Sequence, residues 1–188
     1  MQNEGHKITI GVLALQGGFS LHLAHLKKIG VHAIEVRKKE DLLICNGLIL
    51  PGGESTTIQR HLNEAHMREA LLAFKNPLFG TCAGLIIMAK EGFIPITLTR
   101  NAYGRQSASF STNLNVEFEF KTQTIEGRFI RAPRIAKIDD PEVKVLSQFR
   151  GEPVLIQYRD HLGCCFHPEL TQDLSIHAYF VQLCRHRL

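Results

Sequence analysis

The sequence contains no run of five or six like charges and no long hydrophobic stretch, and each absence excludes a class of protein. Its 22 basic and 18 acidic residues are scattered along the chain and leave a net charge of +4. The longest basic cluster, residues 37–39, is followed at once by Glu40 and Asp41, which indicates a solvated turn rather than a track for phosphates. We therefore expect no nucleic-acid partner.

The chain also lacks a recognisable leader and a cysteine framework. The first apolar run, residues 8–15, is too short to be a signal sequence or to span a bilayer, and Gly17 and Gly18 follow it closely. The five cysteines are odd in number and form no C-x-x-C pair, which fits neither a set of disulfides nor a zinc knuckle. These features predict a soluble, cytoplasmic protein that needs no membrane.

What is present is ordinary globular composition, with 44% hydrophobic and 21% charged residues. At 188 residues the chain is long enough to bury one sizeable core, so we expect a single domain covering residues 1–188. Short apolar runs alternate with helical patterns in the first half, which is typical of parallel strands joined by helices. The expected strands are residues 8–15, 31–36, 47–50 and 77–79, and the expected helices are residues 21–29, 55–75 and 85–90.

The pattern changes in the second half. Residues 116–120 alternate between apolar and charged side chains, and the region from 94 to 162 indicates antiparallel strands. Residues 170–188 have the amphipathic spacing of a C-terminal helix. The predicted fold class is therefore α/β: a mostly parallel central sheet flanked by helices, with additional antiparallel strands in the second half.

The strongest local motif is the GTCAG segment at residues 80–84, which places Cys82 between a buried strand and a helical run. A nucleophile at such a sharp turn stands exposed above the sheet, and small neighbours leave room for the turn. The helix N-terminus would also favour a thiolate. A free cysteine alone is more often a small buried hydrophobe, but only Cys82 among the five has flanking glycines.

A thiol nucleophile needs a base, and the base needs an orienting partner. His167 follows an apolar run, Pro168 stiffens the next step, and Glu169 could hold the imidazole in one tautomer. No other histidine of the ten has this setting. His22 and His25, like His61 and His66, lie in helical runs without a convincing third ligand, so no metal site is expected.

A third motif, LPGGES at residues 50–55, follows a buried strand and precedes a helix, with Ser55 or Thr56 available as the helix cap. Backbone amides there could bind an oxyanion, and Gly53 can bring its N–H close because it has no Cβ. A simple glycine-rich turn is the alternative interpretation of this segment. The segment is neither a Walker motif nor a G-x-G-x-x-G, and no cofactor is expected.

Taken together, the segments GVLALQGGF, LPGGESTT, GTCAGLI, NAYGRQ, FIRAP and CFHPELT resemble class I glutamine amidotransferases over nearly the whole chain. Within that family the ordered set is most similar to the vitamin B6 branch, the glutaminase subunits of pyridoxal 5′-phosphate synthase. The resemblance implies Cys82 as nucleophile, His167 as general base and acid, and Glu169 as the residue that orients it. It also implies an oxyanion hole formed by the backbone N–H groups of Gly53 and Ala83.

The same resemblance implies how substrate and partner are bound. The residues that would hold the carboxylate and amine of L-glutamine are Gly53, Glu54, Ser55, Arg105, Ile130 and Arg131. Gln16 would help to couple the active site to the synthase subunit, which is the expected protein partner. The sequence departs from the family in SASF at residues 107–110 and in the paired cysteines of LGCCF.

Two other functions remain open at the level of the sequence. The chain could be a sister amidotransferase subunit, such as the one serving histidine biosynthesis, with the same triad and another ammonia acceptor. It could also be a catalytically silent scaffolding subunit that keeps the fold. The NAYGRQ and FIRAP segments argue against the first alternative, and the complete set of Cys82, His167 and Glu169 argues against the second.

Overall fold

The computed structural model describes residues 8–99, 109–119 and 121–187. A seven-stranded sheet has the order β2-β1-β3-β4-β11-β10-β9. Its five neighbouring parallel strands are β2 (His32–Val36), β1 (Thr9–Leu13), β3 (Gly47–Leu50), β4 (Leu78–Thr81) and β11 (His161–Cys164). Antiparallel strands β10 (Glu152–Tyr158) and β9 (Val143–Phe149) complete one edge.

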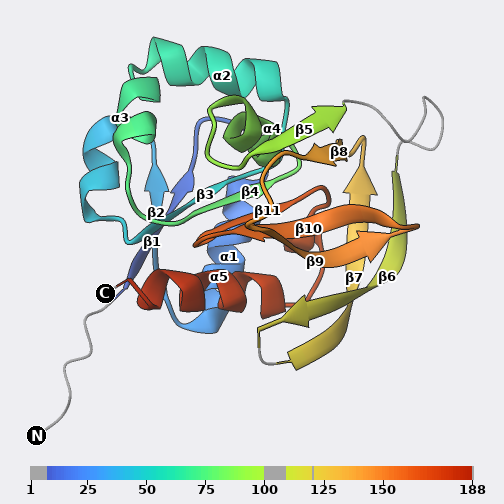
Figure 1. Ribbon diagram of the computed structural model, residues 1–188. Coiled ribbons are helices and arrows are strands. Elements are labelled where there is room, and N and C mark those ends of the chain that lie inside the picture. The colour runs from blue at the N-terminus through green and yellow to red at the C-terminus, as the bar shows by residue number, and fades with distance from the viewer. Residues whose placement is uncertain (1–7, 100–108, 120, 188) are drawn as a thin grey trace, which may run out of the picture.

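Helices cover both faces of this sheet (Figure 1). One face carries α1 (Phe19–Ile29) and α5 (Ser175–Arg185), and the other carries α2 (Ser55–Glu64) and α4 (Ala83–Lys90). Shorter helical segments are η1 (Lys39–Ile44), α3 (Arg68–Ala73) and η2 (Pro168–Leu170). None of the helices in the described part of the chain combines the length and hydrophobicity needed to cross a membrane.

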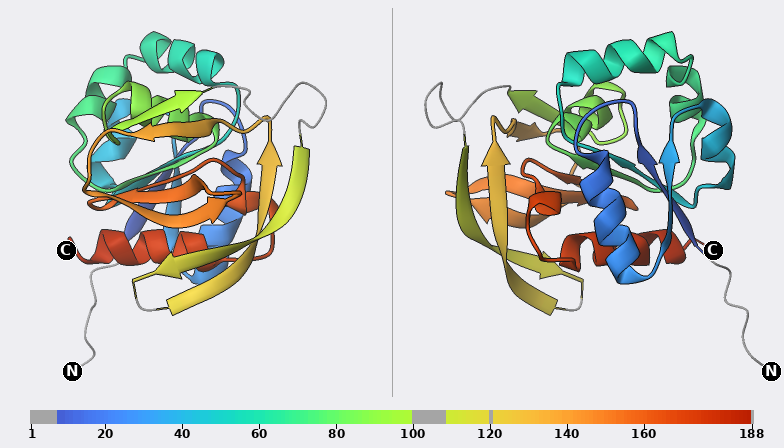
Figure 2. Two further views of the ribbon diagram at one scale, coloured as in Figure 1. Left: turned by 45° about the vertical axis from the view of Figure 1, so that its right-hand side comes forward. Right: turned by 180° about the vertical axis from the view of Figure 1, so that it is seen from behind.

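The second half adds two antiparallel pairs beside the main sheet (Figure 2). A long hairpin joins β6 (Ser109–Phe118) to β7 (Lys121–Ile130), and β5 (Ile96–Thr99) pairs with β8 (Arg134–Ile138). The sequence predicts the fold class correctly: the parallel strands come from the first half and the C-terminal strand β11, and the antiparallel strands lie between residues 96 and 158.

The core explains why β3 and β4 are so apolar. Every residue of these two strands is buried, because helices pack on both sides of them. Gly47 lets α5 approach closely, since a Cβ at this position would lie 2.4 Å from Cys184 Sγ. Close packing of this kind fixes the carboxyl ends of the strands, where the candidate site lies.

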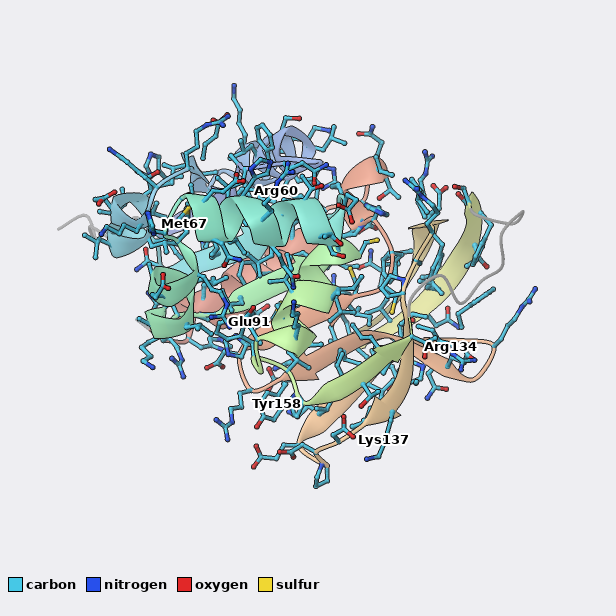
Figure 3. The ribbon with its side chains drawn as sticks, turned by 90° about the horizontal axis from the view of Figure 1, so that it is seen from above. Arg60, Met67, Glu91, Arg134, Lys137 and Tyr158 are labelled. Atoms are coloured by element: carbon cyan, nitrogen blue, oxygen red, sulfur yellow. The ribbon has the colours of Figure 1, made fainter. Side chains whose placement is uncertain are left out.

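One helix prediction is partly wrong. Residues 55–75 form two helices rather than one, and the side chain of Met67 lies at the turn between them (Figure 3). His66 adopts a left-handed φ of 51°, and Met67 N–H donates to Leu62 O over 2.9 Å. This is the usual left-handed termination of a helix, and it points Met67, which is 0% exposed, into the core.

The cap of α2 also differs from the expected Ser55 or Thr56. The side chain of Glu54 accepts hydrogen bonds from the backbone N–H groups of Thr56 and Thr57 over 3.0 and 2.7 Å. A carboxylate is a good cap because it satisfies two free amides and opposes the positive end of the helix dipole. These bonds, with one from the Thr57 hydroxyl, lower the pKa of Glu54 to about 2.

Candidate active site

Cys82 occupies a strained bend between β4 and α4. Its backbone has φ 48° and ψ −102°, and it precedes the first residue of α4. Both flanking glycines are required for the bend: a Cβ on Gly84 would lie 1.9 Å from Leu50 O, and one on Gly80 would lie 2.6 Å from Met88 Sδ. A non-glycine residue in this region costs roughly 1–3 kcal/mol, so the surrounding packing must hold it there.

The Cys82 thiol faces a cavity with a volume of about 580 Å³. The residue is only 7% exposed, and its Sγ lies 3.9 Å from Ile130 O. The thiol therefore meets the cavity at the amino end of α4, where amide dipoles stabilise negative charge.

His167 and Glu169 lie at the start of η2, immediately after the last sheet strand. β11 runs parallel to β4, with Cys164 opposite Thr81, so the chain beyond β11 leaves the sheet beside the bend at Cys82. His167 Nδ1 and Glu169 Oε1 are 2.7 Å apart. Because an ionised carboxylate can only accept, Nδ1 carries the proton, which leaves Nε2 free for the thiol.

The charges of His167 and Glu169 stabilise each other. Burial would lower the pKa of His167, but interactions with the Cys82 thiol and with Glu169 outweigh it and raise that pKa to about 10. Burial would likewise raise the pKa of Glu169, but His22 and His167 bring it below its ordinary value. The arrangement therefore favours an imidazolium between a carboxylate and a sulfur, as an activated thiol nucleophile requires.

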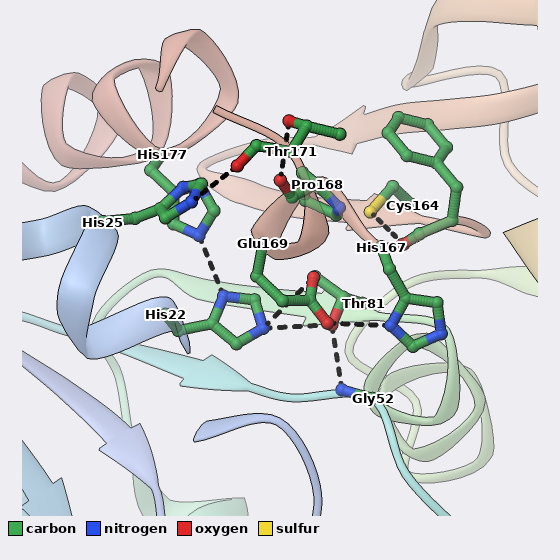
Figure 4. Close-up of polar contacts among 11 residues, drawn as sticks. His22, His25, Gly52, Thr81, Cys164, His167, Pro168, Glu169, Thr171 and His177 are labelled. Atoms are coloured by element: carbon green, nitrogen blue, oxygen red, sulfur yellow. Dashed lines mark hydrogen bonds and ion pairs between the residues drawn. The ribbon is translucent and has the colours of Figure 1, made fainter. Parts of the chain in front are cut away.

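Behind Glu169 lies a set of histidines that the sequence did not mark as functional. His22 Nε2 lies 3.5 Å from Glu169 Oε2, and His22 Nδ1 lies 2.8 Å from His177 Nε2 (Figure 4). His177 in turn contacts His25. His22 and His25 share one face of α1 at i, i+3 spacing, but only the docking of α1 against α5 and η2 shows that they continue the line from His167 through Glu169.

The glycine turn of residues 51–53 lies directly opposite the Cys82 bend. Gly52 N–H donates to Thr81 Oγ1 over 2.9 Å, and Glu54 N–H donates to Gln16 Oε1 over 3.1 Å. The backbone N–H of Gly53 has no acceptor within the described residues. Ala83 is the first residue of α4, where amides have no intrahelical acceptor. Gly53 and Ala83, the two expected oxyanion donors, both line the cavity.

The structure brings most of the expected substrate residues together around this cavity. Arg105 lies outside the described residues. Arg131 directly follows β7 and adopts a left-handed conformation, with φ 44°, and it forms no ion pair with any described residue. The lining residues are Gln16, Gly17, Gly18, Leu21, Gly52, Gly53, Glu54, Ser55, Cys82, Ala83, Ile86, Ile130, Arg131, Pro133, His167, Glu169 and Leu170.

The other four cysteines, Cys45, Cys164, Cys165 and Cys184, are free and buried. Burial raises the pKa of Cys45 to about 11 and that of Cys164 well above its ordinary value. Protonated, inaccessible thiols are poor nucleophiles, which leaves Cys82 as the reactive candidate. Within residues 8–99, 109–119 and 121–187, no group of three or more histidine, cysteine or acidic side chains could hold a metal ion.

Comparison with known proteins adds an independent line of support. The model of the SNO glutamine amidotransferase family matches residues 12–186. The pyridoxal 5′-phosphate synthase subunit PdxT of Staphylococcus epidermidis is 44% identical over 183 residues, covering 93% of this chain and 97% of that protein. PdxT of Pasteurella multocida is 41% identical over 196 residues, covering 98% and 100%. A crystal structure described as a glutamine amidotransferase matches with a TM-score of 0.86 and 40% identity, covering 93% and 98% of the two chains.

Proposed function

The chain belongs to the SNO glutamine amidotransferase family, and on that premise we propose that Cys82, His167 and Glu169 are its catalytic triad. The protein is an enzyme that hydrolyses L-glutamine to L-glutamate and ammonia for the synthesis of pyridoxal 5′-phosphate, the product named in both PdxT descriptions. The observation that carries the triad is the 2.7 Å contact of His167 with Glu169 beside a thiol on a strained bend.

The first half-reaction follows from this geometry. The Cys82 thiolate attacks the side-chain amide carbon of glutamine, and a tetrahedral oxyanion forms. The N–H groups of Gly53 and Ala83 donate to that oxyanion, where one donor is typically worth on the order of a hundredfold in rate. The imidazolium of His167 then gives its Nε2 proton to the departing nitrogen, ammonia leaves, and a γ-glutamyl thioester remains on Cys82.

The second half-reaction uses the same groups in reverse. His167, now neutral, takes a proton from a water molecule, and the resulting hydroxide attacks the thioester carbon. The carbon–sulfur bond breaks, the Cys82 thiolate returns with His167 protonated, and glutamate leaves. Glu169 keeps Nδ1 protonated throughout, so that Nε2 always faces the reacting atoms.

Charged groups at the cavity rim account for selection of an amino acid. Arg131, with Arg105 from the segment outside the described residues, binds the α-carboxylate, for which a guanidinium fork is well suited. The carboxylate of Glu54, ionised over the whole physiological range, attracts the α-ammonium group. Backbone groups of Gly53, Ser55 and Ile130 complete the cradle for glutamine.

The protein partner in this proposal is the synthase subunit that consumes the ammonia. Gln16 is the coupling residue, since it lies at the cavity rim and binds the amide that follows Gly53. A contact made by the partner near Gln16 would thus reach the oxyanion hole through one hydrogen bond. The sister subunit of histidine biosynthesis is not favoured, because both relatives are named as subunits of pyridoxal 5′-phosphate synthase.

The experiment that tests the proposal is a glutaminase assay of the chain with and without the synthase subunit, before and after alkylation of its thiols. We expect ammonia release that the synthase increases and that alkylation of Cys82 abolishes. Peptide mass spectrometry identifies which cysteine is alkylated. Full activity with Cys82 alkylated would refute the triad, and selective stimulation by the histidine-pathway subunit would refute the partner.

A further inference from the structure

Three histidines form a buried line that begins at the triad carboxylate. His22 lies 3.5 Å from Glu169 Oε2 through Nε2 and 2.8 Å from His177 Nε2 through Nδ1. His177 Nδ1 is then 3.2 Å from His25 Nδ1, and His25 Nε2 is 3.1 Å from the carbonyl oxygen of Thr171. We call His22, His177 and His25 the histidine line (Figure 4).

The line is closed to water, which fixes its charge at neutral pH. His22 and His177 are 0% exposed and His25 is 4% exposed. Burial lowers the pKa of all three, that of His22 to about 4, against the opposing pull of Glu169 on His22 and His25. Each ring is therefore neutral and carries one ring proton.

Counting those protons gives a constraint that no single contact shows. The line has four links: Glu169 to His22, His22 to His177, His177 to His25, and His25 to Thr171. Both end groups can only accept, because one is a carboxylate and the other a carbonyl. Three neutral rings supply three protons, so one of the four links must lack a proton.

The link without a proton is the one whose loss costs least. A hydrogen bond to an ionised carboxylate is about twice as strong as one to a neutral carbonyl. The gap is therefore not at the Glu169 end. Wherever it lies among the other three links, the proton of His22 is on Nε2.

A second observation points to the same end of the line. Glu169 Oε2 is buried and has no hydrogen-bond partner among the described residues, although Oε1 is bound by His167. An unpaired buried carboxylate oxygen is costly, and the nearest ring nitrogen is His22 Nε2. The 3.5 Å approach is long for a hydrogen bond, but catalytic contacts are often long before substrate binds and tighten with it.

Other groups around Glu169 do not replace this donor. Thr81 Oγ1 accepts the N–H of Gly52, and its recorded contact toward the line is with His22 Nε2 at 3.4 Å rather than with Glu169. The thiol of Cys164 donates to the carbonyl oxygen of Phe166 over 3.2 Å, and burial raises its pKa well above the ordinary value. Among the described residues, His22 is the side chain whose ring nitrogen faces Oε2 while His167 holds Oε1.

We propose that His22, fixed in its Nε2–H tautomer by His177 and His25, is a positioning residue that holds the second oxygen of Glu169 and so fixes the orientation of His167. The inference rests on the proposed function, since it extends the same triad by one residue. It assigns a role in catalysis to α1 and α5, which the sequence motifs did not reach.

The tautomer can be measured in the wild-type protein without any substitution. Nitrogen-15 NMR of histidine-labelled protein distinguishes Nδ1–H from Nε2–H rings, and a spectrum of His22→Gln assigns the signal of His22. We expect a proton on His22 Nε2 at neutral pH. A proton on Nδ1 alone would leave a lone pair facing Glu169 and would overturn the proposal, whatever the activity of the enzyme.

Two substitutions separate a positioning role from a structural one. His22→Leu removes the donor, and His22→Gln keeps an N–H near the position of Nε2. In the complex with the synthase subunit, we expect His22→Leu to lower kcat about 10- to 100-fold, the size of one hydrogen bond to a charged group, with the KM for L-glutamine little changed. His22→Gln should recover most of that loss.

A loss of stability alone does not shift the pH profile of kcat/KM, so this profile tests the positioning role directly. An N–H of His22 that donates to Oε2 favours the ionised carboxylate of Glu169, so the acidic limb of kcat/KM should shift to higher pH in His22→Leu and much less in His22→Gln. His161→Leu is the matched control, because His161 is a half-buried histidine that accepts the Leu78 N–H outside the site. It should lower Tm and leave the acidic limb in place.

Equal kinetic losses in His22→Leu and His22→Gln, with an unshifted acidic limb, would reduce His22 to a packing residue and overturn the proposal. If His22→Leu does not fold, the NMR tautomer of His22 in the wild-type protein still decides it. A wild-type complex that releases no ammonia from L-glutamine would instead refute the proposed function, and the NMR result separates the two failures.

Discussion

The backbone N–H of Cys82 donates to the carbonyl oxygen of Cys164 over 2.9 Å. This bond joins the bend that carries the proposed nucleophile to the strand that leads into His167. Two segments far apart in the sequence are thereby held at the same edge of the sheet, where parallel strands end. The distance between thiol and imidazole is set by sheet pairing rather than by flexible loops, as a preorganised site requires.

Replacement of Cys82, the proposed nucleophile, gives the first prediction. Cys82→Ala should abolish glutamine hydrolysis. It should leave the fold and synthase binding intact, because the thiol that it removes faces the cavity rather than the core. Ammonia release and a pull-down with the synthase subunit measure the two properties. Cys45→Ala is the control: it also removes a buried thiol, but one in the core, and should retain activity. Undiminished ammonia release by Cys82→Ala would contradict the mechanism.

The raised pKa of His167 predicts how stability depends on pH. The folded pKa is about 10 and the ordinary value is 6.5, so the folded state holds this proton more tightly than the unfolded state. Its stabilisation is fully present below pH 6.5 and is lost as pH rises toward 10. The free energy of unfolding should fall by at most about 1.4 kcal/mol per pH unit on this account.

The matched variant isolates that contribution from the titration of the buried thiols. In a Cys82→Ala background the proton of the thiol no longer offsets the one that His167 gains on folding, while Glu169 still raises the pKa of His167. The difference in unfolding free energy between Cys82→Ala and Cys82→Ala/His167→Gln should therefore shrink as pH rises from 6.5 to 8.5. Urea denaturation at several pH values in this window measures the difference. A difference that does not change with pH would show that His167 is not held as a cation.

A stability prediction concerns the turn between α2 and α3. His66 is exposed and sits in the left-handed region, where a side chain costs energy and glycine does not. His66→Gly should therefore stabilise the fold by about 0.5–1 kcal/mol, after the greater flexibility of glycine in the unfolded chain is counted. Thermal unfolding measures this change. His61→Gly, inside α2, is the control and should destabilise the protein.

This turn also shows what the sequence could and could not predict. The apolar runs of β3 and β4 predicted buried parallel strands, because few other structures need such continuous hydrophobicity. The helix break was missed because His66 takes a conformation that glycine usually marks. The spacing of the residues around it stays helical on both sides, so the sequence pattern alone shows no interruption.

The candidate site also contains residues that the sequence could predict and residues that it could not. Cys82 and His167 lie in short motifs whose local geometry the residue types themselves impose, so they were predicted from sequence. His22 lies in an ordinary amphipathic helix, and its contact with Glu169 exists only because α1 packs against η2. Contacts made by docking of distant helices leave no local pattern. Arg105, predicted as a substrate residue, lies outside the described residues and stays a prediction.

The last prediction concerns the dependence on the synthase subunit. Gln16 Oε1 accepts the N–H of Glu54 over 3.1 Å, and a Cβ on Gly53 would lie 2.5 Å from the same oxygen. Gln16 thus touches the turn that carries a proposed oxyanion donor, and we expect a partner that moves Gln16 to move Gly53 as well. We expect weak glutaminase activity from the isolated chain and strong stimulation by the synthase subunit.

Gln16→Ala should lower that stimulation about tenfold or more, since one oxyanion donor typically contributes on the order of a hundredfold and Gln16 acts on it indirectly. Binding to the synthase, measured by calorimetry, should weaken less than activity does, because a single side chain at the rim is lost. Gln172→Ala is the matched control: this glutamine is exposed and bonds to Lys28 outside the cavity. Full activity of the isolated wild-type chain would show that the oxyanion donors are already in place without a partner, and Gln16 would then have no coupling to transmit.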